Sequence, residues 1–273
     1  MSVVSDKPPV VELKNVSKWF PDPRNGERLV TVKDINLSIA HEAGGAFIVL
    51  LGPSGCGKST ILNLIAGMLT PDEGEVRVFD KLVTGPCPES VTVPQTYTCF
   101  PWLTALGNVE FGLAVQGKSK AARRRTAMEY LKKVNLDDRP NAYPKQLSGG
   151  MQQRVAIART LAMKPPIVLM DEPFGALDAQ TRTEMQQMLL QLWVAEKSHI
   201  IFITHDITEA LLLADRVIVL SPRPAQIVGD LQVPFTRPRA ASLMHEDRFV
   251  NLSQELLQLL KKAPTSGQIR VSV

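Results

Sequence analysis

The sequence has little cysteine and no long hydrophobic run. Only three of its 273 residues are cysteine, and no two of them have the spacing of a metal-binding pair. So sparse a set excludes a disulfide-rich scaffold and is typical of a reducing compartment. No apolar stretch approaches the roughly 18 residues of a membrane-spanning helix, and the first ten residues lack a signal-peptide core. We therefore expect a soluble chain that reaches a membrane only through a partner.

The chain also lacks a strong excess of charge. Lys and Arg number 31 against 27 Asp and Glu, a formal net charge of +4. This balance is too weak to indicate nucleic acid, and it suits an anionic small ligand or the inner face of a membrane equally well. Hydrophobic residues make up 44% of the chain and charged residues 21%. That composition excludes a disordered tail or a coiled coil and indicates a globular protein with a buried core.

Short apolar runs alternate with helical patterns along most of the chain. An alternating strand is predicted at 10–16, buried strands at 46–51, 167–170, 200–204 and 217–220, and helices at 58–69, 154–163, 180–196 and 207–214. This order predicts an α/β fold, a mixed and largely parallel sheet covered by helices. Helical patterns over about 96–163 predict an inserted helical subdomain. We assign 1–222 to one domain, and 223–273 to a proline-containing connection, extended to residue 238, followed by a helix at 246–262.

Residues 52–59 read Gly-Pro-Ser-Gly-Cys-Gly-Lys-Ser, the complete pattern of a phosphate-binding loop between a strand and a helix. Its glycines let backbone N–H groups approach phosphate oxygens, and the helix N-terminus adds positive charge. Lys58 is expected to reach the β- and γ-phosphates and Ser59 to ligate Mg²⁺. The predicted cofactor-binding residues are Gly52, Pro53, Ser54, Gly55, Cys56, Gly57, Lys58, Ser59 and Thr60.

A second apolar strand ends in two carboxylates, Asp171 and Glu172. Open α/β sheets bind ligands at the carboxyl ends of their strands. Two solvated acids at a strand end would not by themselves indicate a functional site. Because the same chain also contains a phosphate loop, we interpret them as part of its active site. We expect Asp171 to hold the Mg²⁺ shell and Glu172 to polarise the attacking water as a general base.

Residues 147–154 read Leu-Ser-Gly-Gly-Met-Gln-Gln-Arg, so Ser148, Gly149 and Gly150 form a second anion-binding helix N-terminus. Here the chain resembles the ATP-binding subunits of ABC transporters, whose signature is LSGGQ followed by a short basic segment. Met151 replaces the usual Gln, as it does in many importers. The resemblance covers roughly 10–222. It implies that two subunits pair head to tail, each signature covering the ATP on the other's phosphate loop.

The same resemblance assigns roles to four isolated residues. Gln95 matches the Gln that touches Mg²⁺ and the water, and His205 matches the switch histidine that contacts the γ-phosphate. Asp178 matches the D-loop at the dimer seam. Phe20 falls at the position that stacks on adenine, with Trp19 as the neighbouring candidate. Two departures are Pro94, where an aromatic residue usually precedes the Gln, and a lengthened first hairpin at 26–30.

The resemblance also implies partners and a location. An ATPase without a membrane span implies separate permease subunits, a second ATPase subunit as a homodimer or homologous heterodimer, and indirectly an extracytoplasmic binding protein. The chain would lie at the cytoplasmic face of a bacterial inner membrane. Residues 101–104, 108–109, 237–239 and 248–249 are similar to the nitrate, sulfonate, taurine and bicarbonate branch. The cofactors implied are ATP and Mg²⁺.

Two other classes of protein fit the sequence less well. A soluble ABC ATPase acting on nucleic acid or ribosomes usually carries two cassettes or a long coiled-coil insertion, whereas this chain has one phosphate loop and a compact interval between Gln95 and Ser148. Its basic run at 123–125 has no interleaved aromatic residues, so nucleic acid is not expected. A GTPase or small-molecule kinase is disfavoured by the signature and by the missing Asn-Lys-x-Asp motif.

Overall fold

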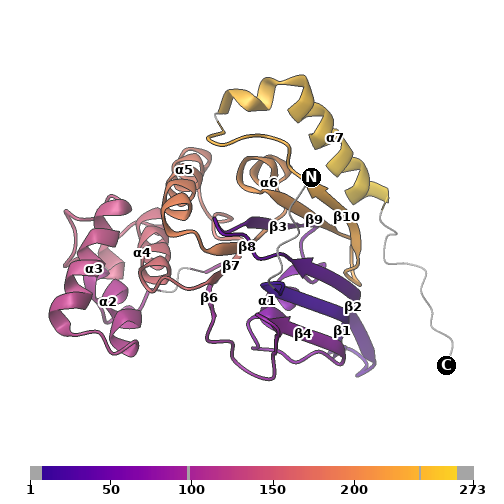
Figure 1. The fold of residues 1–273 in the computed structure, drawn as a ribbon, viewed down its shortest axis with the longest axis horizontal. Coiled ribbons are helices and arrows are strands. Elements are labelled where there is room, and N and C mark those ends of the chain that lie inside the picture. Colours follow the sequence, from indigo (N-terminus) through magenta and orange to yellow (C-terminus); the bar gives the residue numbers. More distant parts are fainter. Residues whose placement is uncertain (1–7, 97–98, 240, 263–273) are drawn as a thin grey trace. The chain divides into compact units, whose positions relative to one another are not determined.

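The computed structural model describes residues 8–96, 99–239 and 241–262. The chain divides into two compact units (Figure 1). The first comprises Met1–Pro88 and Ile201–Val273, and the second comprises Glu89–Ile200. No helix in the described residues is long and apolar enough to cross a membrane.

The first unit holds a four-stranded antiparallel sheet in the order β2-β1-β4-β5 (Figure 1). Alternate side chains of β1 are buried where the period-two pattern predicted a strand. The strand runs further than that pattern, however, because its polar end pairs with β2 as a hairpin. The strands are β1 (Val11–Pro21), β2 (Arg28–Ile39), β4 (Glu73–Val78) and β5 (Lys81–Leu82).

The strand that leads into the phosphate loop is fully buried. This strand, β3 (Phe47–Leu51), pairs in parallel with β9 (Arg216–Leu220). Helix α1 (Lys58–Ile65) follows β3, and α6 (Ile207–Leu213) precedes β9. Strand β8 (His199–Thr204) contains the boundary between the two units. These strands confirm the apolar runs that predicted a buried sheet.

The prediction of an extended connection over 222–238 was wrong in one respect. Residues Ile227–Gln232 form strand β10, which pairs antiparallel with β9. The prolines of this segment lie outside the strand, at 222, 224, 234 and 238, so they remove no N–H group from the ladder. The segment is therefore part of the sheet and not a linker.

The C-terminal helix α7 (Asp247–Lys262) packs against α6, β9 and β10 of its own unit. Its buried side chains include Phe249 and Leu256, and Phe249 stacks on Phe235 with ring centroids 5.8 Å apart. A short 3₁₀ helix, Ala241–His245, precedes it. The helix predicted at 246–262 therefore exists, and it packs onto its own unit.

Two arginines fasten the segment before α7 to the C-terminal end of α6. Arg239 donates to the carbonyl oxygens of Leu211, Leu212 and Ala214 at 3.0, 3.2 and 2.6 Å. Arg237 donates to the carboxylate of Asp215 at 2.8 Å. Burial lowers the pKa of Arg239 to about 10, which still leaves it charged at neutral pH. The last carbonyls of a helix need such donors.

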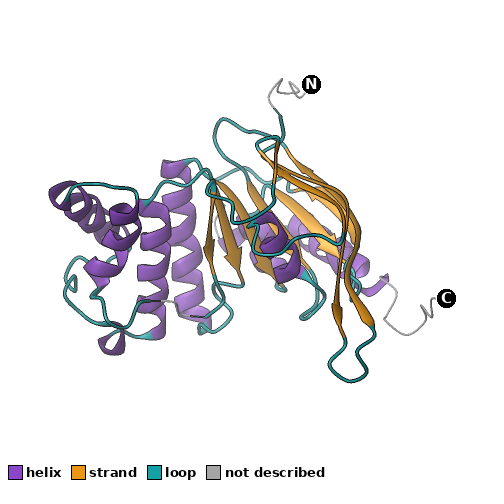
Figure 2. Ribbon diagram, turned by 90° about the horizontal axis from the view of Figure 1, so that it is seen from below, coloured by secondary structure: helices purple, strands orange, loops and turns teal. Residues whose placement is uncertain are grey.

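The second unit combines a parallel strand pair with four helices, which Figure 2 distinguishes by colour. Helix α2 packs against both α3 and α4, and α4 also contacts α5. Gly112 of α2 lies so close to Met163 that a Cβ there would be 2.3 Å from its sulfur. The elements are β6 (Ser90–Val93), β7 (Ile167–Asp171), α2 (Ala105–Val115), α3 (Lys120–Lys133), α4 (Gly149–Ala162) and α5 (Ala179–Glu196).

Candidate active site

The phosphate loop leads into a helix that no side chain caps. Gly57 is the N-cap residue of α1, and no side-chain hydrogen bond caps the helix there. Its φ of 127° is a conformation that favours glycine, and a Cβ would lie 2.9 Å from the carbonyl oxygen of Thr31. Helix N-termini carry unsatisfied N–H groups and partial positive charge. This end of α1 therefore suits an anion.

Lys58 lies over the loop with its ammonium group on backbone carbonyls. The residue is only 4% exposed, and Nζ donates to the oxygens of Gly52 and Pro53 at 2.8 and 3.0 Å. A buried ammonium needs such partners because burying an unpaired charge is costly. The loop thus holds a cation beside the helix end, as the motif predicted.

Cys56 is a buried neutral side chain within the loop. It is 2% exposed. Burial raises the pKa of its thiol, and the positive charges of Lys58 and Arg223 oppose this shift only partly. The thiol is therefore protonated at neutral pH and fills space within the loop as a small neutral side chain.

His205 stands on the turn between β8 and α6. The imidazole residue is exposed, and the turn is fixed on its C-terminal side by Asp206. Asp206 accepts a hydrogen bond from the N–H of Glu209 at 3.0 Å and donates its own N–H to the hydroxyl of Thr204 at 3.0 Å. This capping gives His205 a defined position at the carboxyl end of the strand.

The adenine-stacking candidates differ in how their ring faces are used. The guanidinium carbon of Arg28 lies 3.0 Å from the ring centroid of Trp19, so this face is already covered. The ammonium group of Lys18 lies over the Phe20 ring, with Nζ 5.6 Å from the ring centroid. Both residues are half-buried on β1. A cation thus lies over each ring, and the adenine-stacking role of Phe20 stays a prediction.

In the second unit, β7 ends at Asp171 and Glu172 begins a tight turn. Glu172 has a φ of 41°, in the left-handed region that non-glycine residues rarely adopt. The N–H of Gly175 donates to its carbonyl oxygen at 3.1 Å. Backbone strain of this kind is concentrated at functional sites. Both carboxylate residues are half-buried, at the strand end where the sequence placed them.

The signature segment begins a helix and caps it with its own side chain. Ser148 is the N-cap of α4, and its Oγ accepts a hydrogen bond from the N–H of Met151 at 3.3 Å. Gly149 and Gly150 thus form the first turn, five residues before the start predicted at 154. The start was predicted too far along the chain because glycine is a poor helix former. The cap by Ser148 determines the observed start.

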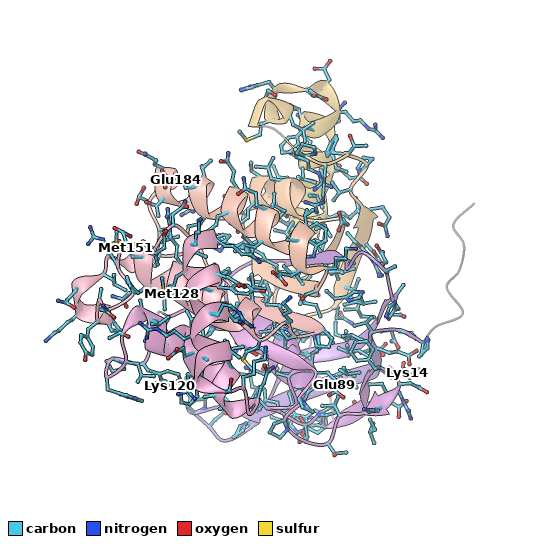
Figure 3. The ribbon with its side chains drawn as sticks, turned by 60° about the vertical axis from the view of Figure 1, so that its left-hand side comes forward. Lys14, Glu89, Lys120, Met128, Met151 and Glu184 are labelled. Atoms are coloured by element: carbon cyan, nitrogen blue, oxygen red, sulfur yellow. The ribbon has the colours of Figure 1, made fainter. Side chains whose placement is uncertain are left out.

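The first turn of α4 lies against the beginning of α5. A Cβ on Gly150 would lie 2.9 Å from the methyl carbon of Thr181. Asp178 caps α5 by accepting from the N–H of Thr181 at 3.0 Å, and this bond lowers the pKa of its carboxyl. Figure 3 labels Met151 on α4 and Glu184 on α5. The structure therefore brings the signature and Asp178 together within one unit.

Gln95 follows β6 on an exposed stretch of chain. Pro94 separates it from the last strand residue, Val93, so the ladder loses no hydrogen bond to the proline. Tyr97 and Thr98, immediately beyond, lie outside the described residues. The position of Gln95 after a strand agrees with the sequence, and its role stays a prediction.

An exposed aromatic group lies on the second unit. The rings of Trp102 and Phe111 lie 5.5 and 4.6 Å from that of Phe100, and Trp102 is 69% exposed. The guanidinium of Arg159 lies 4.9 Å from the Phe100 ring. Asn108, fully buried, donates to the carbonyls of Phe100, Leu103 and Thr104. The sequence analysis singled out residues 101–104, whereas the contact with Phe111 and the network around Asn108 depend on folding.

Among the described residues, no group of three or more His, Cys, Asp or Glu side chains could hold a metal ion. Mg²⁺ does not need such a cage, because it is usually bound by one or two carboxylates together with substrate phosphates. The hydroxyl of Ser59 and the carboxylate of Asp171 are oxygen donors of the kind that Mg²⁺ prefers. Each residue by itself thus has the donor chemistry that Mg²⁺ requires, and its binding of Mg²⁺ stays a prediction.

Comparison with known proteins decides the family. Residues 32–175 match the ABC transporter family. The chain belongs to this family. A nitrate import ATP-binding protein of Synechocystis sp. (strain ATCC 27184 / PCC 6803 / Kazusa) is 43% identical over 263 residues, 93% of this chain and 96% of that protein. A taurine import ATP-binding protein of Chromobacterium violaceum is 47% identical over 218 residues, 78% of this chain and 84% of the other.

A solved structure supports the fold of this ABC protein. It is the dimeric post-hydrolysis state of an ATP-binding cassette bound to ADP and Pi, with a TM-score of 0.70 and 35% identity over 83% of this chain and 100% of that one. The predicted α/β cassette fold is confirmed. This ABC protein is an ATP-binding ATPase of the transporter family.

Proposed function

We propose that this chain is the ATP-hydrolysing subunit of a membrane importer for a small anion, and that residues 52–60 hold the phosphates of ATP. The uncapped N-terminus of α1, with Lys58 buried over the loop, carries the proposal. Backbone N–H groups at a helix end and a fixed ammonium are the donors that phosphate oxygens need. Lys58 would exchange its bonds to Gly52 and Pro53 for the β- and γ-phosphate oxygens.

In the proposed reaction, Glu172 accepts a proton from the water that attacks the γ-phosphorus. His205 hydrogen-bonds the γ-phosphate, and Gln95 orients the water. Mg²⁺, held by Ser59, Asp171 and Gln95 with the phosphates, would neutralise the charge that develops on them. The strained backbone of Glu172 supports this role, because it fixes the carboxylate at a strand end. Phe20 would stack on adenine.

The signature supports a site completed by a second subunit. Ser148, Gly149, Gly150 and Asp178 lie at one corner of the second unit, and helix ends of this kind bind anions. The related solved cassette is a dimer bound to ADP and Pi. We infer that two copies, or two homologous chains, pair head to tail when ATP binds.

The exposed aromatic group of residues 100–103 and 111 would contact the permease. Its exposed apolar side chains, Trp102 at 69% and Phe111 at 45%, sit on a backbone fixed by buried Asn108. Exposed aromatic residues on a rigid base are typical of protein interfaces. This contact would hold the chain at the cytoplasmic face of the membrane and transmit ATP-driven closure to the channel.

The proposed cargo is a small anion of the nitrate, sulfonate or bicarbonate type, and relatives named for nitrate and taurine import support this class. The transported molecule would touch the permease and a binding protein but not this chain. Reconstitution with the cognate permease tests the proposal. Anion-loaded binding protein is expected to stimulate ATP hydrolysis; stimulation by a sugar, an amino acid or a metal alone would contradict it.

A further inference from the structure

The turn between β9 and β10 contacts the phosphate loop through a hydrogen bond from Arg223 to Gly55. We call this turn the brace and define it as residues 221–225. The hydroxyl oxygen of Ser221 lies 2.9 Å from the carbonyl oxygens of both Pro222 and Pro224, which share its single O–H donor, and it accepts from the N–H of Gln226 at 3.0 Å. Ser221 itself is buried. One hydroxyl thus ties the turn together from inside.

The brace is also joined to β2. The N–H of Ala225 donates to the carbonyl of Thr31 at 2.8 Å, and the N–H of Lys33 donates to the carbonyl of Ala225 at 3.0 Å. These bonds form a parallel bridge between Val32 and Ala225. The brace therefore has the stiffness of the sheet edge and not that of a surface loop.

The brace reaches the phosphate loop at two points. At Gly57, a Cβ would lie 2.9 Å from the Thr31 carbonyl oxygen and 3.2 Å from the Cβ of Ala225. At Gly55, the Nη2 atom of Arg223 donates to the backbone carbonyl at 3.1 Å. The loop is consequently held from behind by packing at one glycine and by a hydrogen bond at the other.

The bond to Gly55 controls the direction of the next N–H group. In a planar trans peptide the carbonyl and the following N–H point in opposite directions. Arg223 fixes the Gly55 carbonyl, so the N–H of Cys56 is turned the other way, where it makes only a long bond of 3.3 Å to the oxygen of Pro53. A phosphate oxygen could replace that weak acceptor.

The loop needs such an external constraint at Gly55. The φ of Gly55 is 72°, and among the described residues no heavy atom outside its chain neighbours lies within 4 Å of where a Cβ would be. Packing therefore does not fix this peptide. Packing also does not explain why residue 223 is an arginine. Its Nε is buried without a hydrogen-bond partner among the described residues, and an apolar side chain there would avoid this cost.

We propose that Arg223 is a positioning residue for nucleotide binding, which holds the Gly55–Cys56 peptide in the orientation that receives the β-phosphate of ATP or ADP. This inference rests on the proposed role of residues 52–60. Its function is to preorganise the loop, so it acts on binding and not on the chemical step.

The test compares Arg223→Met and Arg223→Lys with wild type in steady-state ATP hydrolysis and in equilibrium binding of MgATP and ADP. Arg223→Met is expected to raise KM for ATP and Kd for both nucleotides about tenfold, while kcat at saturating ATP stays within about twofold. Arg223→Lys keeps the cation and one donor, so it is expected to recover most of the affinity. Arg223→Gln also loses the charge and the reach of the arginine. If Arg223→Met folds poorly, Arg223→Gln replaces it in the test, and the same tenfold rise in KM and Kd is expected.

Arg77→Met serves as the matched control, since Arg77 lies on β4 of the same unit and pairs with Glu75 at 2.9 Å. Unchanged Kd values in both Arg223→Met and Arg223→Gln, or a fall in kcat with unchanged KM, would overturn the proposal. Equal weakening by Arg77→Met would do the same. Lys58→Ala distinguishes failure of the loop assignment from failure of the Arg223 proposal. If Lys58→Ala binds ATP normally, the assignment of the phosphate loop is wrong. If Lys58→Ala loses ATP binding but the Arg223 variants keep it, only the role of Arg223 is wrong.

Discussion

The two helices that follow glycine-rich segments, α1 and α4, begin differently. Gly57 offers α1 no side-chain cap, whereas Ser148 caps α4 through the N–H of Met151 at 3.3 Å. The buried ammonium group of Lys58 lies at the start of α1, whereas exposed Ser148 stands at the start of α4. The first helix end therefore suits the proposed phosphate site of this chain. In the second, the Ser148 hydroxyl already serves a backbone N–H group, so binding of the proposed ligand would require that bond to be exchanged.

This difference matches the two proposed roles. The start of α1 would bind the phosphates of the chain's own nucleotide, and the start of α4 would contact the nucleotide bound by a partner. A helix end without a side-chain cap gains more from a phosphate than a capped end does. A capped end gains less, so it suits a contact made only when a partner presents an already bound nucleotide. The changes below are ordered from the largest expected effect to the smallest, and each isolates one side of the comparison.

Glu172→Gln should separate binding at α1 from turnover. The amide keeps the shape of the carboxylate but cannot accept the proton, so hydrolysis should fall by about 10²–10⁴. ATP affinity should change little, because the loop is untouched. Single-turnover kinetics with a parallel binding titration check both. A variant that hydrolyses ATP at the wild-type rate would remove Glu172 from the reaction.

Lys58→Ala should disable α1 alone. It removes the ammonium that faces the phosphates, and a charge-assisted bond contributes about 1.5–3 kcal/mol. ATP affinity should therefore fall roughly ten- to hundredfold, measured by calorimetry. Lys14→Ala is the control, because Lys14 is an exposed lysine paired with Glu12 on β1 of the same unit. Equal losses in both variants would contradict a specific role for Lys58.

Arg239→Met extends the comparison to a helix C-terminus, the end of α6. The buried guanidinium serves the carbonyls of Leu211, Leu212 and Ala214, and leaving buried acceptors unpaired costs about 1–3 kcal/mol. The free energy of unfolding should fall by about 2 kcal/mol in urea titration. Arg248→Met, on exposed α7 surface, should change it by less than about 0.5 kcal/mol. A stable Arg239→Met protein would show that the carbonyls find other donors.

Ser148→Ala should act on the capped end only. Loss of an N-cap destabilises a protein by about 1 kcal/mol, so a small fall in thermal stability is expected. Nucleotide binding to the single subunit should stay within about twofold of wild type, since α1 is intact. If ATP binding to the isolated subunit collapses, the signature belongs to the same-chain site and the comparison fails.

Trp102→Ala should leave both helix ends as they are. The exposed side chain contributes little to folding, so stability should change by less than about 0.5 kcal/mol, with ATP affinity unchanged. Co-purification with the permease from detergent extract should decrease. Val115→Ala is the matched control, because Val115 is 73% exposed at the end of α2. Normal assembly of Trp102→Ala would exclude this patch as the interface.

Much of the fold and of the candidate site could be predicted from the sequence because the information is local. The apolar runs gave β3, β7, β8 and β9, and the phosphate loop and signature are contiguous motifs whose chemistry is explicit. Boundaries were less accurate where a tertiary contact or a cap sets them. Strand β1 extends to Pro21 because β2 pairs with its polar end, and α4 starts at Gly149 because Ser148 caps it.

Other features depend on contacts between distant residues and left no local signal. Arg223 reaches Gly55 across 168 residues of sequence, so no window of sequence contains both partners. Strand β10 was missed because prolines flank it, although its pairing with β9 avoids them. The buried role of Asn108 likewise follows only from the folded path of residues 100–104.

The most direct test of the account is the oligomeric state of Glu172→Gln with ATP, with and without Ser148→Arg. Sedimentation velocity should show an ATP-dependent dimer for Glu172→Gln. The double variant should bind about one ATP per subunit through α1 and remain monomeric, because the arginine blocks the second helix end. Loss of ATP binding in the double variant, or an ATP-dependent dimer despite Ser148→Arg, would contradict a resident site at α1 completed by the partner's α4.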